Sequence, residues 1–320
     1  MNPPLIEIRD LYKDYPLPKK YLFKKAPVFS ALKGITLDIN RGINFGIVGE
    51  SGCGKSTLAR IVMALDTPTK GSVSFNGQDL FSVSAKDLKH LRRNFQMVFQ
   101  DPYGSLNPRK TIQSIVAEPL DTLNETLSYP QKKDRVSRIL TEVGLNTSDA
   151  DKFPHEFSGG QRQRIAIARA LITRPSLIVA DESVSALDVS VQAQVLNLMM
   201  DLQEKYNLTY MFISHDLSVV EYITDQVAVI YLGQIVEQGT TRNLFGNPRH
   251  PYTQTLLYAV PDLNPLNRQT RNKAVSSQFE KTDYGCSFID RCHKATDRCA
   301  QSAPALLEYG DQLAACFHVD

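Results

Sequence analysis

The sequence has little net charge and no long hydrophobic run. It carries 36 Lys and Arg against 34 Asp and Glu, and this formal net charge of +2 gives no basic field that would attract nucleic acid. No apolar stretch approaches the ~20 residues that a membrane-spanning helix needs. The first residues mix charges with prolines and lack the hydrophobic region of a secretory signal. These absences predict a cytoplasmic protein with no nucleic-acid partner, which reaches any membrane through other proteins.

Cysteine is almost absent from the chain until its end. Cys53 stands alone, and the remaining four lie close to the C-terminus, at Cys286, Cys292, Cys299 and Cys316. In a cytoplasmic chain such a group is more often a metal site than a disulfide framework. A length of 320 residues suits about two domains. We therefore expect a main domain over residues 1–245 and a C-terminal extension with a cysteine cluster over 246–320.

Short apolar runs alternate with helical patterns over most of the main domain. The runs at 45–48, 177–180 and 210–213 are nearly continuous, as expected for strands buried on both faces of a parallel sheet. Between two of them, one helical stripe carries Val191, Val195, Leu198 and Leu202. The alternation predicts an α/β fold with a mostly parallel sheet and right-handed crossovers.

Other segments depart from this alternation. Runs of period two at 5–8, 35–39 and 72–75 indicate additional β-strands, and Asn76-Gly77 after the last of them is a hairpin signal. A polar, helix-compatible stretch at about 101–160 predicts an inserted helical subdomain. The regular pattern ends near Gly239, and residues 262–285 have the composition of a linker.

A glycine-rich segment follows the first buried run and precedes a helix-compatible run at 57–65. It matches the pattern G-x-x-x-x-G-K-[ST]. Glycines let backbone N–H groups surround phosphate oxygens, Lys55 adds a charge at the β- and γ-phosphates, and the Ser56 hydroxyl can bind Mg²⁺. Cys53 fits best as a small filler, and a ligand-free glycine turn is the alternative for the whole segment. The predicted nucleotide-binding residues are Gly49, Ser51, Gly52, Cys53, Gly54, Lys55, Ser56 and Thr57.

Polar side chains follow the other buried runs at their carboxyl ends, where ligands sit in open α/β sheets. Asp181 is placed to bind Mg²⁺, and Glu182 is placed to orient and deprotonate a water molecule. His215 can donate a hydrogen bond to a γ-phosphate oxygen. Gln100 can touch both the metal and the attacking water. Alone, each would be read as an ordinary exposed turn residue, and the phosphate motif favours the catalytic interpretation.

A second anion site is predicted at Ser158-Gly159-Gly160-Gln161. These residues precede Ile165, Ala168 and Leu171 at helical spacing, which indicates an uncapped helix N-terminus opened by glycine. One nucleotide does not need two separate anion sites on one chain. A head-to-tail dimer does need them, because each nucleotide then lies between the two chains.

These residues together resemble the ATP-binding-cassette family over residues 5–240. The resemblance implies a P-loop NTPase fold with a mostly parallel sheet, an antiparallel β subdomain and a helical insertion, and it implies ATP and Mg²⁺ as ligands. It also implies that Ser158–Gln161 complete the partner's site and that Asp188 lies at the dimer seam. An N-terminal aromatic residue stacks on adenine in this family, and Tyr15 is the best-placed counterpart, with Tyr12 second.

A closer resemblance is to the ATPase subunits of bacterial dipeptide and oligopeptide importers. It rests on residues 100–109, on 247–253 and on the late cysteines. It implies a peripheral protein on the cytoplasmic face of the bacterial inner membrane. The implied partners are a second cassette, generally a paralogue, two transmembrane permease subunits, and a periplasmic or extracellular substrate-binding protein. Two departures from the family are Ser183, where proline is usual, and the lack of a proline-rich run before Cys286.

Several alternatives stay open. The cysteine tail resembles one that binds a 4Fe–4S cluster, whereas Zn²⁺, with His293 or His318 as substitute ligands, and unliganded thiols or disulfides also fit the composition. Nickel or another small solute could replace peptides as cargo. A soluble cassette of DNA repair or translation is the third function. Finally, the lysines at 19, 20, 24 and 25 form either a lipid-facing patch or a solvated loop.

Overall fold

The computed structural model describes residues 3–18, 26–122, 127–259, 279–280, 282 and 284–319. The lysine-rich segment at 19–25 and most of the expected linker at 262–285 lie outside these ranges. In the described part, no helix is both long and apolar enough to pass through a membrane.

The larger sheet contains the strands that the apolar runs predict, and five adjacent strands at one end of it are parallel. Its order is β11-β12-β10-β9-β3-β8-β7-β6. The bounds are β3 (Asn44–Val48), β6 (Phe95–Val98), β7 (Leu177–Asp181), β8 (Thr209–Ser214), β9 (Gln226–Tyr231), β10 (Gln234–Thr240), β11 (Leu307–Tyr309) and β12 (Gln312–Ala314). The predicted α/β fold with a mostly parallel sheet is confirmed.

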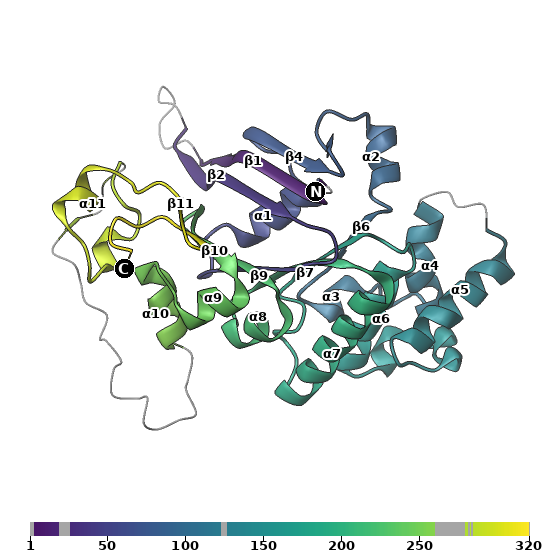
Figure 1. Cartoon of the computed structure of the whole chain (residues 1–320). Coiled ribbons are helices and arrows are strands. Elements are labelled where there is room, and N and C mark those ends of the chain that lie inside the picture. The colour runs from purple at the N-terminus through teal and green to yellow at the C-terminus, as the bar shows by residue number, and fades with distance from the viewer. Residues whose placement is uncertain are drawn as a thin grey trace.

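A smaller antiparallel sheet lies above the larger one (Figure 1), with the order β2-β1-β4-β5. It comprises β1 (Ile6–Pro16), β2 (Val28–Ile39), β4 (Lys70–Phe75) and β5 (Gln78–Asp79). Asn76 and Gly77 have φ values of 54° and 75°, which is the backbone geometry of a two-residue hairpin. The three period-two runs therefore form strands as predicted.

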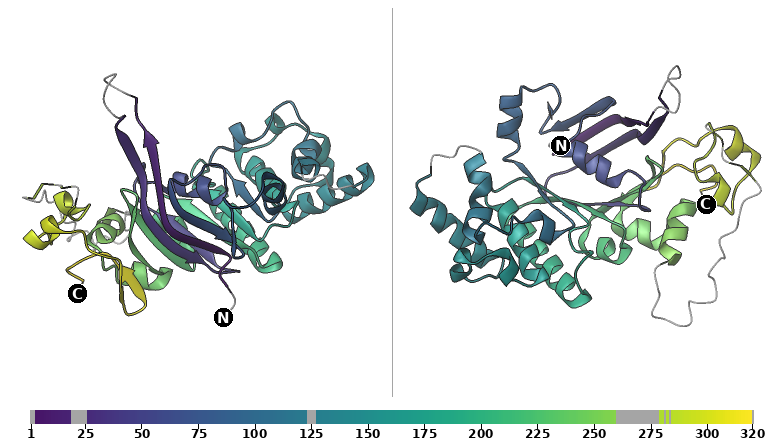
Figure 2. Two further views of the ribbon diagram at one scale, coloured as in Figure 1. Left: turned by 90° about the horizontal axis from the view of Figure 1, so that it is seen from above. Right: turned by 180° about the vertical axis from the view of Figure 1, so that it is seen from behind.

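Helices cover both faces of the larger sheet. Helix α1 (Lys55–Val62) lies between the two sheets, whereas the helices of the insertion and α7 lie on the opposite face (Figures 1 and 2). The remaining helices are α2 (Ala85–Leu91), α3 (Pro102–Ser105), α4 (Ile112–Thr122), α5 (Tyr129–Glu142), α6 (Gly159–Leu171), α7 (Val189–Tyr206), α8 (Leu217–Ile223), α9 (Thr241–Gly246), α10 (Pro251–Ala259) and α11 (Asp297–Gln301), with short 3-10 turns η1 (Thr147–Asp151), η2 (Pro154–Glu156) and η4 (Ile289–Arg291).

Two helix predictions need correction. The run at 57–65 is helical only to Val62, because Ala64 adopts a left-handed backbone with φ 49° and Leu65 is half exposed. In α7, the buried stripe consists of Val195, Leu196, Met199 and Leu202, whereas Val191 and Leu198 are only partly buried. The stripe is thus rotated slightly from the one that periodicity indicated.

The C-terminal extension joins the larger sheet. Strand β12 pairs antiparallel with β10, and β11 pairs with β12 at the sheet edge. A separate apolar core connects the extension to the main domain, with Phe288 and Cys292 packed beside Tyr231 and Tyr252. The expectation that regular structure ends near Gly239 is therefore wrong, since the sheet continues with residues 307–314.

Candidate active site

The phosphate-binding loop runs from the end of β3 to the start of α1. Strand β3 is buried along its whole length and fixes the point where the loop begins. Gly49 has φ 152°, and a Cβ there would lie 2.2 Å from the Ile230 carbonyl oxygen. Gly54, with φ 111°, is the N-cap of α1 and makes no side-chain capping bond. The first turn of α1 can therefore direct its free N–H groups at an anion.

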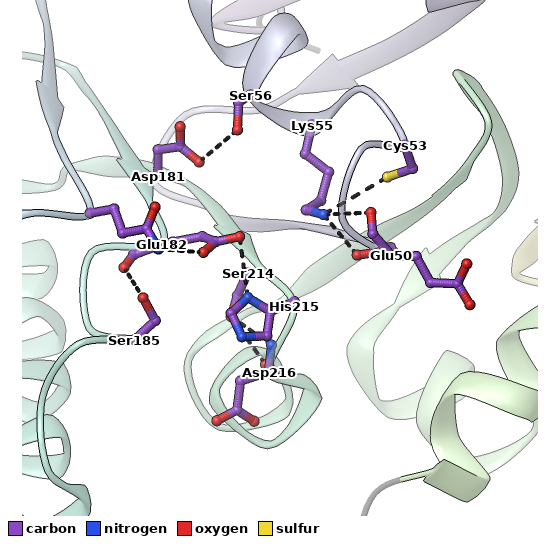
Figure 3. A network of polar contacts seen from close by, with 12 residues as sticks. Glu50, Cys53, Lys55, Ser56, Asp181, Glu182, Ser185, Ser214, His215 and Asp216 are labelled. Atoms are coloured by element: carbon purple, nitrogen blue, oxygen red, sulfur yellow. Dashed lines mark hydrogen bonds and ion pairs between the residues drawn. The ribbon is translucent and has the colours of Figure 1, made fainter. Parts of the chain in front are cut away.

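Lys55 is buried and turned back into the loop (Figure 3). Its Nζ donates to the carbonyl oxygens of Gly49 and Glu50, at 2.7 and 3.0 Å. The Sγ of Cys53 lies 3.9 Å from the same Nζ. Burial raises the pKa of the Cys53 thiol, which keeps it protonated and suits the expected filler role. The lysine charge thus sits at the centre of the loop.

Two oxygen ligands face each other beside the loop. Ser56 Oγ, in the first turn of α1, lies 3.5 Å from Asp181 Oδ1, at the end of β7 (Figure 3). Burial raises the pKa of Asp181, and the neighbouring Glu182 charge acts in the same direction. A divalent cation would stabilise the ionised carboxylate here. Hydroxyl and carboxylate oxygens are also ligands that Mg²⁺ prefers, so these two residues fit the predicted metal role.

Glu182 is held by groups at the ends of the two strands beside β7. Its Oε2 accepts a hydrogen bond from Gln100 Nε2 at 2.9 Å, and its Oε1 lies 3.2 Å from His215 Nδ1. Its backbone has φ 49°, and its N–H donates to the Ile213 carbonyl oxygen. Three predicted catalytic side chains therefore meet at the carboxyl ends of β6, β7 and β8, as the strand positions indicated.

The second predicted anion site at residues 158–161, which we call the signature segment, does not contribute to this cluster. Ser158 Oγ accepts from Gln161 N at 3.4 Å, and Gln161 Oε1 accepts from Ser158 N at 3.0 Å. The helix is thus capped, which corrects the prediction of an uncapped N-terminus. Gly160 packs against α7, where a Cβ would meet Val191 at 2.2 Å, and Gly159 lies near Leu187. Helices α1 and α6 belong to different cores on opposite faces of the sheet.

Asp188 follows Glu182 in sequence and is the N-cap residue of α7. Its carboxylate accepts from Val191 N at 3.0 Å and from Ser190 Oγ at 2.8 Å. These bonds lower its pKa, led by the bond from Val191. The side chain is exposed, and in this chain it makes a capping contact rather than a contact with the phosphate loop.

The two candidate tyrosines on β1 have different neighbours. Tyr15 donates to Asp66 Oδ2 at 2.7 Å and also interacts with the Thr57 side chain, beside the phosphate loop. Tyr12 instead packs near Gly34 and under Lys70, whose Nζ is 4.9 Å from its ring. Only Tyr15 lies next to α1, which favours it as the adenine neighbour.

Sequence reasoning missed a contact between the loop and the extension. Glu50, the second residue of the phosphate motif, pairs with Arg291, and its backbone N–H donates to the Tyr252 hydroxyl at 2.9 Å. Tyr252 belongs to the segment 247–253 that carried the family resemblance. Arg291 lies one residue before Cys292. No spacing rule links positions 241 residues apart.

The four late cysteines gather in the extension as free thiols. Burial raises the pKa values of Cys286, Cys292 and Cys316, that of Cys292 to about 11. Of the two candidate histidines, His318 lies near a thiol, with Nε2 3.6 Å from Cys299 Sγ, whereas His293 is exposed. Within the described ranges, no three or more His, Cys, Asp or Glu side chains are arranged to hold a metal ion.

Comparison with known proteins agrees with this geometry. The family model described as "ABC transporter" matches residues 32–185, and the model described as "Oligopeptide/dipeptide transporter, C-terminal region" matches residues 236–299. A dimeric structure of the ATP-binding cassette MJ0796, in a post-hydrolysis state with ADP and Pi, aligns with a TM-score of 0.65 and 29% identity. It covers 74% of this chain and 99% of that cassette. The fold and site thus define an ATPase of the ABC transporter class.

Full-length relatives narrow the class. The chain is 50% identical to the dipeptide transport ATP-binding protein DppF of Escherichia coli, over 100% of this chain and 96% of the relative. It is 44% identical to the oligopeptide transport ATP-binding protein OppF of Salmonella typhimurium, over 99% and 96%. The chain belongs to the family of ATP-binding subunits of dipeptide and oligopeptide ABC transporters. The predicted ATPase and peptide-transport function is confirmed at the level of this family.

Proposed function

We propose that this chain binds ATP at a seam between two cassettes and uses its hydrolysis to energise the import of dipeptides or oligopeptides. The observation that carries the proposal is the placement of two phosphate-binding elements on opposite faces of one sheet. The loop that begins at Gly49 and the helix that begins at Gly159 cannot hold one nucleotide within a single chain. A second cassette supplies the missing half to each site.

The loop and the carboxylate cluster would have different roles in ATP hydrolysis. Lys55 and His215 contact the γ-phosphate, and Glu182 orients and deprotonates the attacking water, with Gln100 holding that carboxylate at 2.9 Å. Phosphoryl transfer needs positioning and charge stabilisation more than covalent chemistry, which suits this set of polar groups. The opposing cassette contributes its own counterparts of Ser158 and Gly160.

The remaining predicted residues complete the nucleotide site. The loop N–H groups between Gly49 and Thr57, apart from that of Glu50, which donates to Tyr252, surround the phosphates. Tyr15 packs against adenine. Ser56, Asp181 and Gln100 are the proposed Mg²⁺ ligands, and the 3.5 Å approach of the first two supports this role. When bound, Mg²⁺ neutralises charge on the phosphate oxygens. Asp188 lies at the seam, from where it reaches the partner.

A groove beside Gln100 is the proposed docking site for a permease subunit. Its volume is about 660 Å³, and its lining includes the exposed side chains of Leu65 and Phe99 with Lys89 and Arg92. Phe99 is adjacent to Gln100, which bonds the catalytic carboxylate. An apolar floor with basic side chains suits an amphipathic cytoplasmic helix of a permease. Closure of the cassettes would move this groove and the bound helix together.

The proposed assembly has a second cassette, two transmembrane permeases and an external substrate-binding protein, with this chain on the cytoplasmic face of the membrane. We favour a paralogue as the second cassette, because the resembled importers generally pair two different ATPases. Relatives named for dipeptide and oligopeptide transport favour peptide over nickel as cargo. They also disfavour a role in DNA repair or translation.

The four late cysteines are proposed to bind a 4Fe–4S cluster, with Zn²⁺ as the alternative. The extension supplies four free cysteine thiols. Deprotonated thiols are soft ligands, which both Zn²⁺ and iron–sulfur clusters prefer. Raised pKa values mean that a cation must displace their protons. Iron and sulfide analysis of anaerobically purified protein tests this proposal. About four irons and four sulfides per chain would support it, whereas zinc without iron would replace it.

Purification in mild detergent, followed by mass spectrometry, tests the assembly. Two polytopic proteins and a second cassette should accompany this chain, and reconstituted vesicles should take up labelled dipeptide only with ATP. Ribosomes or DNA in place of membrane proteins would contradict the proposed role. Uptake of nickel but not of peptide would change the cargo and leave the ATPase function intact.

A further inference from the structure

The extension contacts the phosphate-binding loop through an ion pair between Arg291 and Glu50. Arg291 donates two parallel hydrogen bonds to the Glu50 carboxylate, with Nη1–Oε2 at 3.0 Å and Nη2–Oε1 at 2.8 Å. Such paired contacts fix the direction of both groups as well as their separation. Glu50 lies between Gly49 and the free N–H groups of the loop. The ion pair therefore acts on the backbone that must surround the phosphates.

A second contact reaches the same residue from α10. The Tyr252 hydroxyl accepts a hydrogen bond from the Glu50 N–H at 2.9 Å, and the tyrosine is fully buried. Phe288 packs on it with ring centroids 5.4 Å apart, and Arg291 lies over Phe288 at 5.5 Å. Side chain and backbone of Glu50 are thus held by one packed aromatic cluster.

We propose that Arg291 is a positioning residue for ATP binding, supplied by the extension to the phosphate-binding loop. Lys55 holds the loop from inside through two carbonyl oxygens, and Arg291 with Tyr252 holds it from outside. Ordering a loop residue upon binding costs conformational entropy. A loop fixed beforehand avoids that cost, which strengthens binding without a new contact to the ligand.

This arrangement predicts an effect on affinity rather than on the chemical step. Glu50 and Arg291 do not touch Glu182, Gln100 or His215 in any described contact. Removing the ion pair should therefore raise KM and Kd for ATP and leave kcat nearly unchanged. Both side chains are 44% exposed, so solvent and salt screen the pair and the effect is modest.

The test uses the full-length protein and four variants, namely Arg291→Ala, Arg291→Lys, Glu50→Gln and the Arg291→Ala/Glu50→Gln double variant. Binding of a fluorescent N-methylanthraniloyl ATP and steady-state ATPase kinetics are measured at low and high salt. We expect Arg291→Ala to raise Kd and KM about three- to fivefold at low salt, with kcat within twofold. Arg291→Lys should recover part of the loss, and high salt should shrink the difference.

A matched control exists in the antiparallel sheet. Arg9 also makes a two-bond contact, with Asp38, and these side chains are 44% and 45% exposed, but neither touches the loop. Arg9→Ala should leave Kd and KM for ATP unchanged. A similar shift in this variant would mean that loss of any surface ion pair weakens binding, and it would overturn the proposal.

The double variant isolates the coupling. If the two residues act on ATP through each other, the double variant should bind no more weakly than Arg291→Ala alone. Additive losses would contradict the proposal. Should Arg291→Ala disturb the extension, seen as a changed thiol titration, Glu50→Gln decides instead, because it leaves the extension sequence intact. An unchanged Kd in Glu50→Gln would then overturn the proposal. ATP hydrolysis and peptide uptake by the wild type do not depend on either outcome.

Discussion

The phosphate-binding loop and α6, the helix that begins in the signature segment (the signature helix), both present glycines to an anion. They differ in how the backbone around those glycines is supported. The loop uses left-handed glycines and leaves the first turn of α1 without a side-chain cap, so it depends on Lys55 and Tyr252 for support. The signature helix has no left-handed residue among its glycines and caps itself through Ser158 and Gln161.

The two sites therefore differ in whether their backbone N–H groups already have hydrogen-bond partners. The loop has N–H groups that are available to phosphate, because no side chain caps the start of α1. Its strained backbone is retained because the surrounding strands fix it. The signature helix is already satisfied in the isolated chain. Its cap includes a 3.4 Å bond from Gln161 N to Ser158 Oγ, which an incoming phosphate could replace at low cost. The loop therefore should bind ATP first, and the signature helix should follow when two cassettes meet.

The largest effect should come from Glu182→Gln, which separates binding from chemistry on the loop side. The amide cannot accept the proton of the attacking water, so turnover should fall about 10²- to 10⁴-fold while ATP binding and cassette closure persist. Phosphate release and gel filtration with ATP measure the two properties. Phosphate release near the wild-type rate would rule out the general-base role.

Exchange of a glycine for alanine should affect the two elements unequally. In Gly49→Ala, φ 152° and the 2.2 Å approach to the Ile230 carbonyl should lower the free energy of unfolding by about 3 kcal/mol. In Gly159→Ala, the nearest atom is Leu187 Cδ2 at 3.5 Å, and the change should stay within about 0.5 kcal/mol. Urea unfolding compares them, and equal losses would contradict the contrast drawn here.

Acid should weaken the support of the loop but not the self-capped helix. Burial lowers the pKa of His250 to about 4, and its Nδ1 accepts from Tyr252 N at 3.0 Å. The unfolded chain therefore binds more protons, and stability should fall by about 2 kcal/mol between pH 7 and pH 5. Burial also raises the pKa of the nearby Glu237, which acts in the opposite direction at lower pH.

His250→Asn supplies the comparison for that prediction. Its side-chain oxygen can still accept from Tyr252 N, but it has no proton to gain in this range. Urea unfolding at pH 7, 6 and 5 should show a steeper loss for the wild type than for the variant. Parallel curves would show that another group controls the pH dependence.

The smallest effect, about twofold in ATPase activity, tests whether the signature segment completes the nucleotide site of its own chain or that of the partner. Ser158→Arg in this chain is paired with a second cassette whose phosphate-loop lysine is changed to Ala. In the shared-site arrangement this chain's loop still faces an intact signature, so about half of the activity should remain. Combining Ser158→Arg with Lys55→Ala in this chain, opposite an unmodified partner, should abolish it. The reverse pattern would show that each chain completes its own site.

The sequence predicted most of the fold and of the loop-side cluster, because those residues lie at fixed positions after buried strands. Asp181, Glu182 and His215 follow apolar runs directly, so their meeting at one sheet edge followed from the parallel topology. The cap on α6 could also have been predicted, since Ser158 and Gln161 fit the S-x-x-Q capping pattern. The two glycines that follow Ser158 instead suggested an open N-terminus.

Other features had no such signal. Strands β11 and β12 have three residues each, which is too short for a period to be recognised. The contact between Glu50 and Arg291 depends on how the extension packs, and nothing local in either segment encodes it. Long-range contacts of this kind required the structure.

The attachment of β12 has a consequence for shortened versions of the protein. Residues Glu237–Gly239 of β10 obtain their outer backbone partners from residues 312–314. A fragment that stops before β11 would expose this row of N–H and C=O groups as an open template for other chains. Removing the tail should thus promote aggregation, so the cassette is best produced with its tail attached.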